Sequence, residues 1–157
     1  MNSAHIGKQA PLVTLLSTGG EHSAADLRGK NLVLYFYPKD NTPGCTQEGQ
    51  EFNELLAEFA RHNTLVLGVS RDSLTSHQRF KERHGLAFDL VSDPEEVLCT
   101  HYDVIKMKNM YGKQVRGIER STFLIDHQGI LRQAWRKVKV TNHAAEVLAT
   151  VKLLTDY

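Results

Sequence analysis

An unbroken run of apolar, β-forming residues is the feature that most constrains the fold of this chain. It covers residues 31–37, where six successive apolar residues follow Asn31, and it stops at Pro38. The run is too short for a buried helix, and a strand that is apolar at every position is buried on both faces. Such strands lie in sheets that helices cover on both sides. The run therefore predicts a central strand of an α/β protein.

The segments after this run alternate between helical and strand patterns. In chain order the patterns predict a helix over 45–61, a strand over 64–70, a helix over 73–84 that ends at Gly85, a strand over 88–91, and a helix over 93–102 that begins with Pro94. These predictions rest on apolar residues recurring at helical spacing, on continuous β-branched runs and on terminal Pro or Gly. The order is that of parallel βαβ units.

Three further patterns complete the expected architecture. The patterns predict an antiparallel hairpin of residues 121–126 and 130–138, joined by residues 127–129. They also predict a C-terminal helix over residues 142–154. Near the start, Leu12–Leu16 and the turn over 17–20 indicate a small hairpin or edge element. Together the patterns predict a mixed central β-sheet with helices on both faces.

Length and composition set the class of protein. At 157 residues, the chain has room for one domain, and 41% hydrophobic with 24% charged residues is typical of a globular protein. No apolar run approaches a membrane span, and Met1–Pro11 lacks the pattern of a secretory signal, so we expect a cytoplasmic protein. With 19 basic and 18 acidic residues, no nucleic acid or membrane partner is expected.

Charge is nevertheless uneven along the chain. Residues 104–140 carry nine basic residues against two acidic ones. Most of these basic residues are expected on a solvated face, and one or two could support an anion at a site.

The loop after the first strand carries the strongest chemical signal. Thr42 is a good N-cap, Pro43 suits the first helical position, and Gly44 leaves the backbone uncrowded. Cys45 then falls in the first helical turn, where unpaired N–H groups and the positive end of the helix dipole favour a thiolate over a thiol. This geometry predicts a nucleophile at Cys45.

The spacing Pro38-x3-Thr42-x2-Cys45 closely resembles the active-site signature of the peroxiredoxins. The wider chain resembles the bacterioferritin-comigratory-protein (peroxiredoxin Q) subfamily, and the matching segments are 32–48, 69–73, 90–94, 109–122 and 134–140. This resemblance implies a thioredoxin-like fold, a monomer, and a thiol-dependent peroxidase without cofactor or metal.

The resemblance also implies roles for single residues. Cys45 would be the peroxidatic cysteine that attacks a hydroperoxide, Thr42 would position the peroxide, and Pro38 would shield the sulfur from water. Arg120 matches the active-site arginine of the family. Glu48, one helical turn beyond Cys45, could orient an arginine, or it could be a solvated or capping residue.

Other cysteine chemistries fit the sequence less well. A Cys-x5-Arg phosphatase needs arginine where Glu51 stands, and a thioredoxin-like Cys-x-x-Cys motif is absent around Cys45. The eight histidines show no placement suited to a papain-like protease and are expected mostly at the surface. Neither a His-x3-His metal spacing nor a glycine-rich nucleotide loop is present.

The sequence does not decide whether one or two cysteines take part in the catalytic cycle. Positions where family members carry a resolving cysteine hold Gln50 and Lys81, so only Cys99 remains. We favour a one-cysteine mechanism, in which a thioredoxin, a glutaredoxin or glutathione reduces the Cys45 sulfenic acid. The alternatives are a Cys45–Cys99 disulfide, and a non-enzymatic redox sensor or binding module on the same fold.

Overall fold

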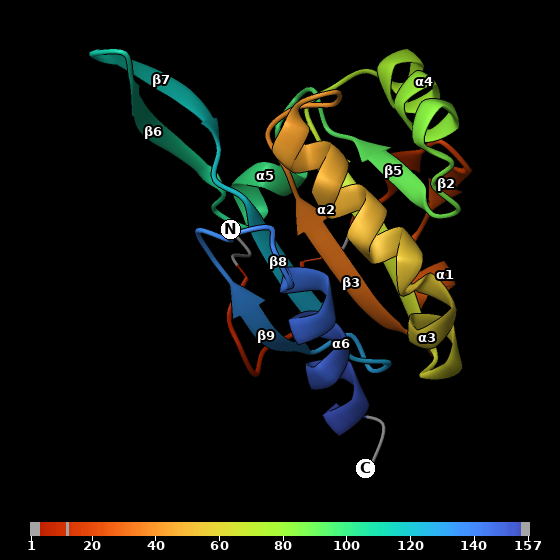
Figure 1. Cartoon of the computed structure of the whole chain (residues 1–157). Helices are drawn as coiled ribbons and strands as arrows, with labels where there is room; N and C mark the ends of the chain where they lie inside the picture. Colours follow the sequence, from red (N-terminus) through yellow and green to blue (C-terminus); the bar gives the residue numbers. More distant parts are fainter. Residues whose placement is uncertain (1–3, 12, 155–157) are drawn as a thin grey trace.

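Strands β1–β5, β8 and β9 build a seven-stranded sheet at the centre of the protein (Figure 1). The structure is a computed structural model and describes residues 4–11 and 13–154. The strands of this sheet are β1 Leu15–Ser17, β2 Gly20–His22, β3 Asn31–Phe36, β4 Thr64–Ser70, β5 Asp89–Ser92, β8 Ser121–Ile125 and β9 Leu131–Trp135. Their spatial order is β2-β1-β5-β4-β3-β8-β9.

The sheet is mixed, as the sequence predicts. Strands β3, β4 and β5 run parallel, whereas β8 is antiparallel to β3 and β9 is antiparallel to β8. The run after Asn31 forms β3, which has neighbours on both sides and is buried at every position. The expected hairpin over 121–138 is confirmed as β8 and β9.

Six helices connect the strands or close the chain in the described residues. They are α1 Ala24–Leu27, α2 Pro43–Glu54, α3 Leu56–Arg61, α4 Leu74–His84, α5 Val97–His101 and α6 His143–Leu154. Figure 1 shows α2 and α6 side by side across one face of the sheet. No helix in the described part of the chain is long and apolar enough to cross a membrane.

Successive side chains of β3 pack alternately into two separate hydrophobic cores, one on each face of the sheet. Val33 and Tyr35 pack with residues of α2, α3, α4 and α6, and Cys45 belongs to this group. Leu32 and Leu34 pack on the other side with residues of α5, including Cys99. We call these two sides the α2 face and the α5 face. Since both are covered by helices, the predicted two-sided arrangement is confirmed.

Two helix predictions need correction. The helix expected over 45–61 is broken at Leu55, whose N–H bonds back three residues to Phe52. The side chain of Asn53 bonds the backbone of Gly85 and Ala87, which ties the end of α2 to the turn after α4. This tertiary contact is not visible in the helical periodicity.

The helix expected from Pro94 begins instead at Val97. The carboxylate of Asp93 accepts hydrogen bonds from the backbone N–H groups of Val97, Leu98 and Cys99. It therefore caps the helix although it stands four residues before the first helical residue. Residues 94–96 form the turn in between, and Glu96 adopts a left-handed conformation with φ of 61°. Asp93 satisfies the free N–H groups and thereby sets the start of α5.

Near the N-terminus, β1 and β2 form the expected small hairpin around residues 18–19, and β2 is an edge strand. Leu12, where that prediction began, lies outside the described residues. A second hairpin was not expected from the sequence. It consists of β6 Ile105–Met110 and β7 Lys113–Ile118, which pair only with each other and project from the body (Figure 1).

Candidate active site

The connection from β3 to α2 places Cys45 at the start of a helix. Thr42 occupies the N-cap position, Pro43 is the first helical residue, and Cys45 is the third. Cys45 is buried, with 1% of its surface exposed. The predicted location in the first turn is therefore confirmed, and the sulfur lies where the N–H groups of the helix start favour a negative charge.

Thr42 does not act as the expected side-chain cap. Its hydroxyl donates to the carbonyl of Lys39 at 2.9 Å, and no capping hydrogen bond forms. The Thr42 side chain therefore tightens the loop between Pro38 and α2. Its oxygen keeps lone pairs that can accept a hydrogen bond, while Pro38, half-buried, begins this loop.

The register of β8 brings Arg120 to the same end of the sheet. Ser121 pairs with Phe36, so Arg120 stands just beyond the carboxyl end of β3, where the loop toward Cys45 begins. The Arg120 Nη2 donates to Cys45 Sγ at 3.3 Å, and 15% of the arginine side chain is exposed. The guanidinium is thus a cation in direct contact with the sulfur.

Glu48 holds the other arm of the guanidinium. Arg120 Nη1 donates to Glu48 Oε1 at 2.6 Å, so the contact with an arginine that the sequence left open is present. Burial raises the pKa of Glu48 to about 7, although Arg120 opposes this rise. Its second oxygen, Oε2, has no hydrogen-bond partner among the described residues.

Arg120 keeps its charge in this pocket. Burial alone would lower the pKa of Arg120, but the charges of Glu48 and Cys45 outweigh burial and raise it. Gly44 leaves the space that this contact needs, because a Cβ at Gly44 would lie 3.2 Å from Arg120 Nη2. The three groups at Cys45, Glu48 and Arg120 therefore form one connected unit.

Cys99 is not part of this unit. It lies on the α5 face, with its backbone N–H bonded to Asp93 Oδ2 at 2.9 Å, whereas Cys45 lies on the α2 face. Burial raises the pKa of Cys99, and the charge of Asp93 raises it further. Of the residues singled out from the sequence, the structure thus brings Cys45, Glu48 and Arg120 into contact, and it leaves Cys99 across the sheet.

A buried polar network next to the site was missed by sequence reasoning. His77 Nδ1 lies 2.7 Å from Asp40 Oδ2, and His77 Nε2 lies 2.9 Å from the Val91 carbonyl. The Asp40 carboxylate also accepts from Tyr37 and Ser76. Burial would raise the pKa of Asp40, but the hydrogen bonds from His77 and Tyr37 lower it.

This network fixes the loop that precedes α2. The two ring nitrogens of His77 thus face two acceptors, the carboxylate of Asp40 and the carbonyl of Val91, which hold the ring in place. The network joins the loop at Asp40 to α4. The signal that could have found it is Tyr37, a tyrosine at the end of a buried strand, whose hydroxyl needs a partner.

Two of the eight histidines are exceptions to the expectation that histidines lie mostly at the surface. His77 and His143 are both buried, whereas the other six are exposed or half-buried. His143 Nε2 is hydrogen-bonded to Thr122 Oγ1 at 2.8 Å. Burial lowers the pKa of His143 to about 4, so this ring is neutral at pH 7.

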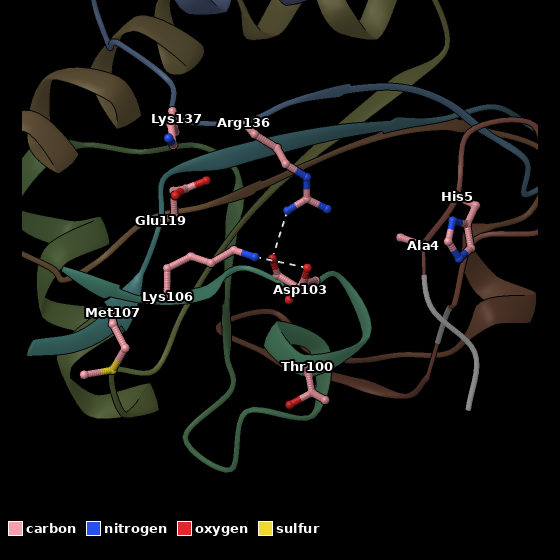
Figure 2. Close-up of a pocket in the computed structure, with 9 residues that line it drawn as sticks. All are labelled: Ala4, His5, Thr100, Asp103, Lys106, Met107, Glu119, Arg136 and Lys137. Carbon is pink, nitrogen blue, oxygen red and sulfur yellow. Dashed lines mark hydrogen bonds and ion pairs between the residues drawn. The ribbon is translucent and has the colours of Figure 1, made fainter.

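A surface hollow of about 840 Å³ lies apart from Cys45, at the base of β6 (Figure 2). Figure 2 shows Lys106 and Arg136 both directed at Asp103, the first as an ion pair at 3.1 Å and the second as a donor to its carbonyl. Lys106 is therefore paired with the Asp103 carboxylate, and Arg136 is held by the backbone carbonyls of Tyr102 and Asp103. The hollow therefore does not compete with the Cys45 unit as the chemical site.

Comparison with protein families agrees with a thiol-based site on this fold. The model of the AhpC/TSA family matches residues 6–134. The chain belongs to the AhpC/TSA family.

Individual relatives narrow the assignment. Peroxiredoxin Bcp from Xanthomonas campestris pv. campestris is 58% identical over 137 residues, which cover 87% of this chain and 86% of the relative. A mutant of Xylella fastidiosa PrxQ superimposes with a TM-score of 0.91 and 48% identity over 98% of this chain and 99% of that one. The Bacterioferritin Comigratory Protein structure from Xanthomonas campestris gives a TM-score of 0.86 and 55% identity over 91% and 92%. Within the family the chain is a peroxiredoxin of the Bcp/PrxQ group, a thiol peroxidase with the thioredoxin fold.

Proposed function

We propose that Cys45 is the peroxidatic cysteine and reduces hydrogen peroxide and organic hydroperoxides. The contact of 3.3 Å between Arg120 Nη2 and Cys45 Sγ, at the start of α2, is the observation that carries this proposal. A sulfur held between a helix N-terminus and a guanidinium is a ready nucleophile. The described activity of the Xanthomonas campestris relative toward alkyl peroxides supports the organic substrates.

The chemical step follows from the positions of the donors. The Cys45 thiolate attacks one peroxide oxygen, an S–O bond forms, and the O–O bond breaks. The leaving oxygen takes a proton and departs as water or an alcohol, and Cys45 becomes a sulfenic acid. Arg120 can donate to the sulfur before the attack and to the developing oxyanion during it, which lowers the barrier.

The neighbouring residues act on this step in different ways. Because the Thr42 hydroxyl already donates to Lys39, its oxygen is free to accept the proton of the bound hydroperoxide. Pro38 limits the access of water to the sulfur. Glu48 is a positioning residue that keeps Arg120 directed at Cys45.

The oxidised cysteine is reduced by an external thiol in this proposal. A disulfide between Cys45 and Cys99 would require two sulfurs on opposite faces of the sheet to meet, although bridged cysteines have α-carbons within about 7 Å. A thioredoxin, a glutaredoxin or glutathione therefore completes the cycle through a mixed disulfide. We also propose that the protein acts as a monomer.

Treatment with one equivalent of hydrogen peroxide, followed by mass spectrometry, tests the mechanism. We expect a sulfenic acid on Cys45 that a dimedone probe traps, and a free Cys99. An intramolecular disulfide would instead establish the two-cysteine mechanism. Steady-state assays with thioredoxin or glutaredoxin then separate an enzyme, which turns over, from a redox sensor, which stops after one oxidation.

A further inference from the structure

The β6–β7 hairpin is the part of the described chain whose purpose the fold does not explain. Its two strands pair with each other and with no strand of the main sheet. Figure 1 shows it extending away from the helices and the sheet. A two-stranded hairpin has little stability of its own, so a long one standing free suggests a role outside the fold.

Apolar side chains are exposed along this hairpin. Of the eight large apolar side chains that are exposed in the described residues, four belong to the β6–β7 hairpin: Met107, Met110, Tyr111 and Val115. Tyr111, in the turn, is 100% exposed. Such a concentration on one small element is typical of an interaction surface.

Pairing register separates the two sides of the hairpin. Directly opposed residues share a face, and the pairs Lys106–Gly117, Lys108–Val115 and Met110–Lys113 therefore define one face, which we call the lysine face. The opposite face contains Met107 and Arg116. The lysine face thus combines three lysines with two apolar side chains.

The positive charge of the lysine face is only partly neutralised. Residues 105–118 contain four basic residues and no acidic one. Arg116, on the opposite face, pairs with Glu96, and Lys106 pairs with Asp103 at the base (Figure 2). Lys108 donates to the carbonyl of Ile118, and Lys113 has no carboxylate partner among the described residues. Lys108 and Lys113 therefore keep a positive field on this face.

The base of the lysine face adjoins the candidate active site. Strand β7 ends at Ile118, two residues before Arg120, and the Lys108 ammonium reaches that end of the strand. Burial lowers the pKa of Lys108, and the charge of Arg120 lowers it further, which places the two cations near each other. A molecule bound along this face would extend over the region of Cys45.

We propose that the lysine face docks the protein that reduces oxidised Cys45, a dithiol reductant with acidic and apolar residues around its reactive cysteine. This proposal rests on the proposed function. The charge of the face calls for an acidic partner, and its exposed Met110 and Val115 call for apolar contact. Strands of six residues span about 20 Å, which suits a protein surface better than a small thiol.

Docking would bring the partner's sulfur to Cys45 for two exchange steps. The partner's thiol forms an S–S bond with Cys45 while the S–O bond of the sulfenic acid breaks, and the oxygen leaves as water. The partner's second thiol then attacks the mixed disulfide on the partner's own sulfur. Cys45 leaves as a thiolate, and the partner is oxidised to a disulfide.

The double variant Met110→Ser/Lys113→Glu tests the docking surface. Neither residue contacts Cys45, Glu48 or Arg120. We expect kcat/KM for thioredoxin, coupled to thioredoxin reductase and NADPH, to fall about tenfold, and the rate with dithiothreitol to stay within twofold. Raising the salt concentration should weaken the wild type more than the variant. If thioredoxin does not turn over, the same comparison is made with glutaredoxin.

A matched control is available at the other end of the sheet. The double variant Lys30→Glu/Leu153→Ser also changes one exposed lysine and one exposed apolar side chain, and both lie outside the hairpin. We expect its kcat/KM for thioredoxin to equal that of the wild type. An equal loss in both double variants would overturn a specific docking role for the lysine face.

Two further outcomes would also overturn the proposal. One is an unchanged kcat/KM in the Met110→Ser/Lys113→Glu variant, and the other is a wild-type dimer in light scattering that this variant converts to a monomer. Oxidation of Cys45 by one equivalent of peroxide is measured in the same variants. If wild-type Cys45 forms no sulfenic acid, the proposed function itself fails; if it forms normally, only docking is in question.

Discussion

Cys45 and Cys99 occupy the same local position in two different helices. Cys45 is the third residue of α2, Cys99 is the third residue of α5, and both side chains are buried. Their neighbours carry opposite charges. A guanidinium lies against Cys45, whereas the carboxylate of Asp93 already occupies the N–H groups at the start of α5.

This difference shows that a helix start alone does not produce a reactive thiol. At α5, burial and the negative charge of Asp93 raise the pKa of Cys99 and favour the protonated form. At α2, the N–H groups and Arg120 both favour a negative sulfur. The charged group at the N-terminus of each helix therefore determines whether its cysteine is suited to act as a nucleophile.

The largest expected effect separates the two cysteines directly. Cys45→Ser should abolish peroxidase activity, because the attacking sulfur is lost, and Cys99→Ser should keep activity within twofold. Peroxide consumption in the presence of thioredoxin or glutaredoxin measures both. Loss of activity in the Cys99 variant with an intact fold by circular dichroism would contradict the contrast.

Removing the cation at Cys45 tests the role of charge. Arg120→Met should slow the reaction of Cys45 with peroxide by about a hundredfold to a thousandfold, as expected for loss of a donor at a developing oxyanion. Stopped-flow measurement of the oxidation step gives this rate. Arg61→Met is the matched control, because Arg61 forms an exposed ion pair with Glu58, and its rate should not change.

The buried carboxyl group of Glu48, which contacts Arg120, should make the free energy of unfolding depend on pH. Because the pKa of Glu48 is about 7 in the folded protein and 4.5 in a model compound, the folded state binds the extra proton between these values. The free energy of unfolding should therefore fall by about 3 kcal/mol as pH rises from 4.5 to 7, and then level off from this cause.

Glu48→Gln should remove this fall while keeping an acceptor for Arg120. Urea unfolding of both proteins across pH 4.5–8 measures the effect, and the comparison uses the difference between variant and wild type at each pH. A difference that does not change with pH would show that Glu48 is ionised throughout.

The smallest expected effect concerns the hydroxyl before α2. Thr42→Val removes the bond to Lys39 and the acceptor proposed for the peroxide, and we expect about a tenfold slower oxidation of Cys45. Thr42→Ser keeps the hydroxyl and should stay near the wild-type rate. Equal rates for the valine and serine variants would remove Thr42 from the proposed mechanism.

Local signals predicted the nucleophile and its helix, whereas its partner Arg120 was implied only by the family resemblance. Strand β3 follows from an uninterrupted apolar run, and the start of α2 follows from Thr42 and Pro43. The break at Leu55 was not predicted, because the Asn53 side chain bonds backbone groups of Gly85 and Ala87 that are distant in sequence. The start of α5 was placed too early, because Asp93 rather than Pro94 sets it. The β6–β7 hairpin was missed because its strands lack an apolar pattern, although Tyr111 and Gly112 form its turn.

The sequence by itself determined that a cysteine stands at the beginning of a helix after a buried strand, since apolar runs and capping residues act over a few positions. The residue patterns alone did not single out the basic residue that meets it: the family resemblance implied Arg120, and the tertiary structure shows how Arg120 reaches the sulfur. The register of β8 against β3 brings Arg120 to a sulfur 75 residues away along the chain. The packing of α2 and α5 against opposite faces of the central sheet likewise separates Cys45 from Cys99.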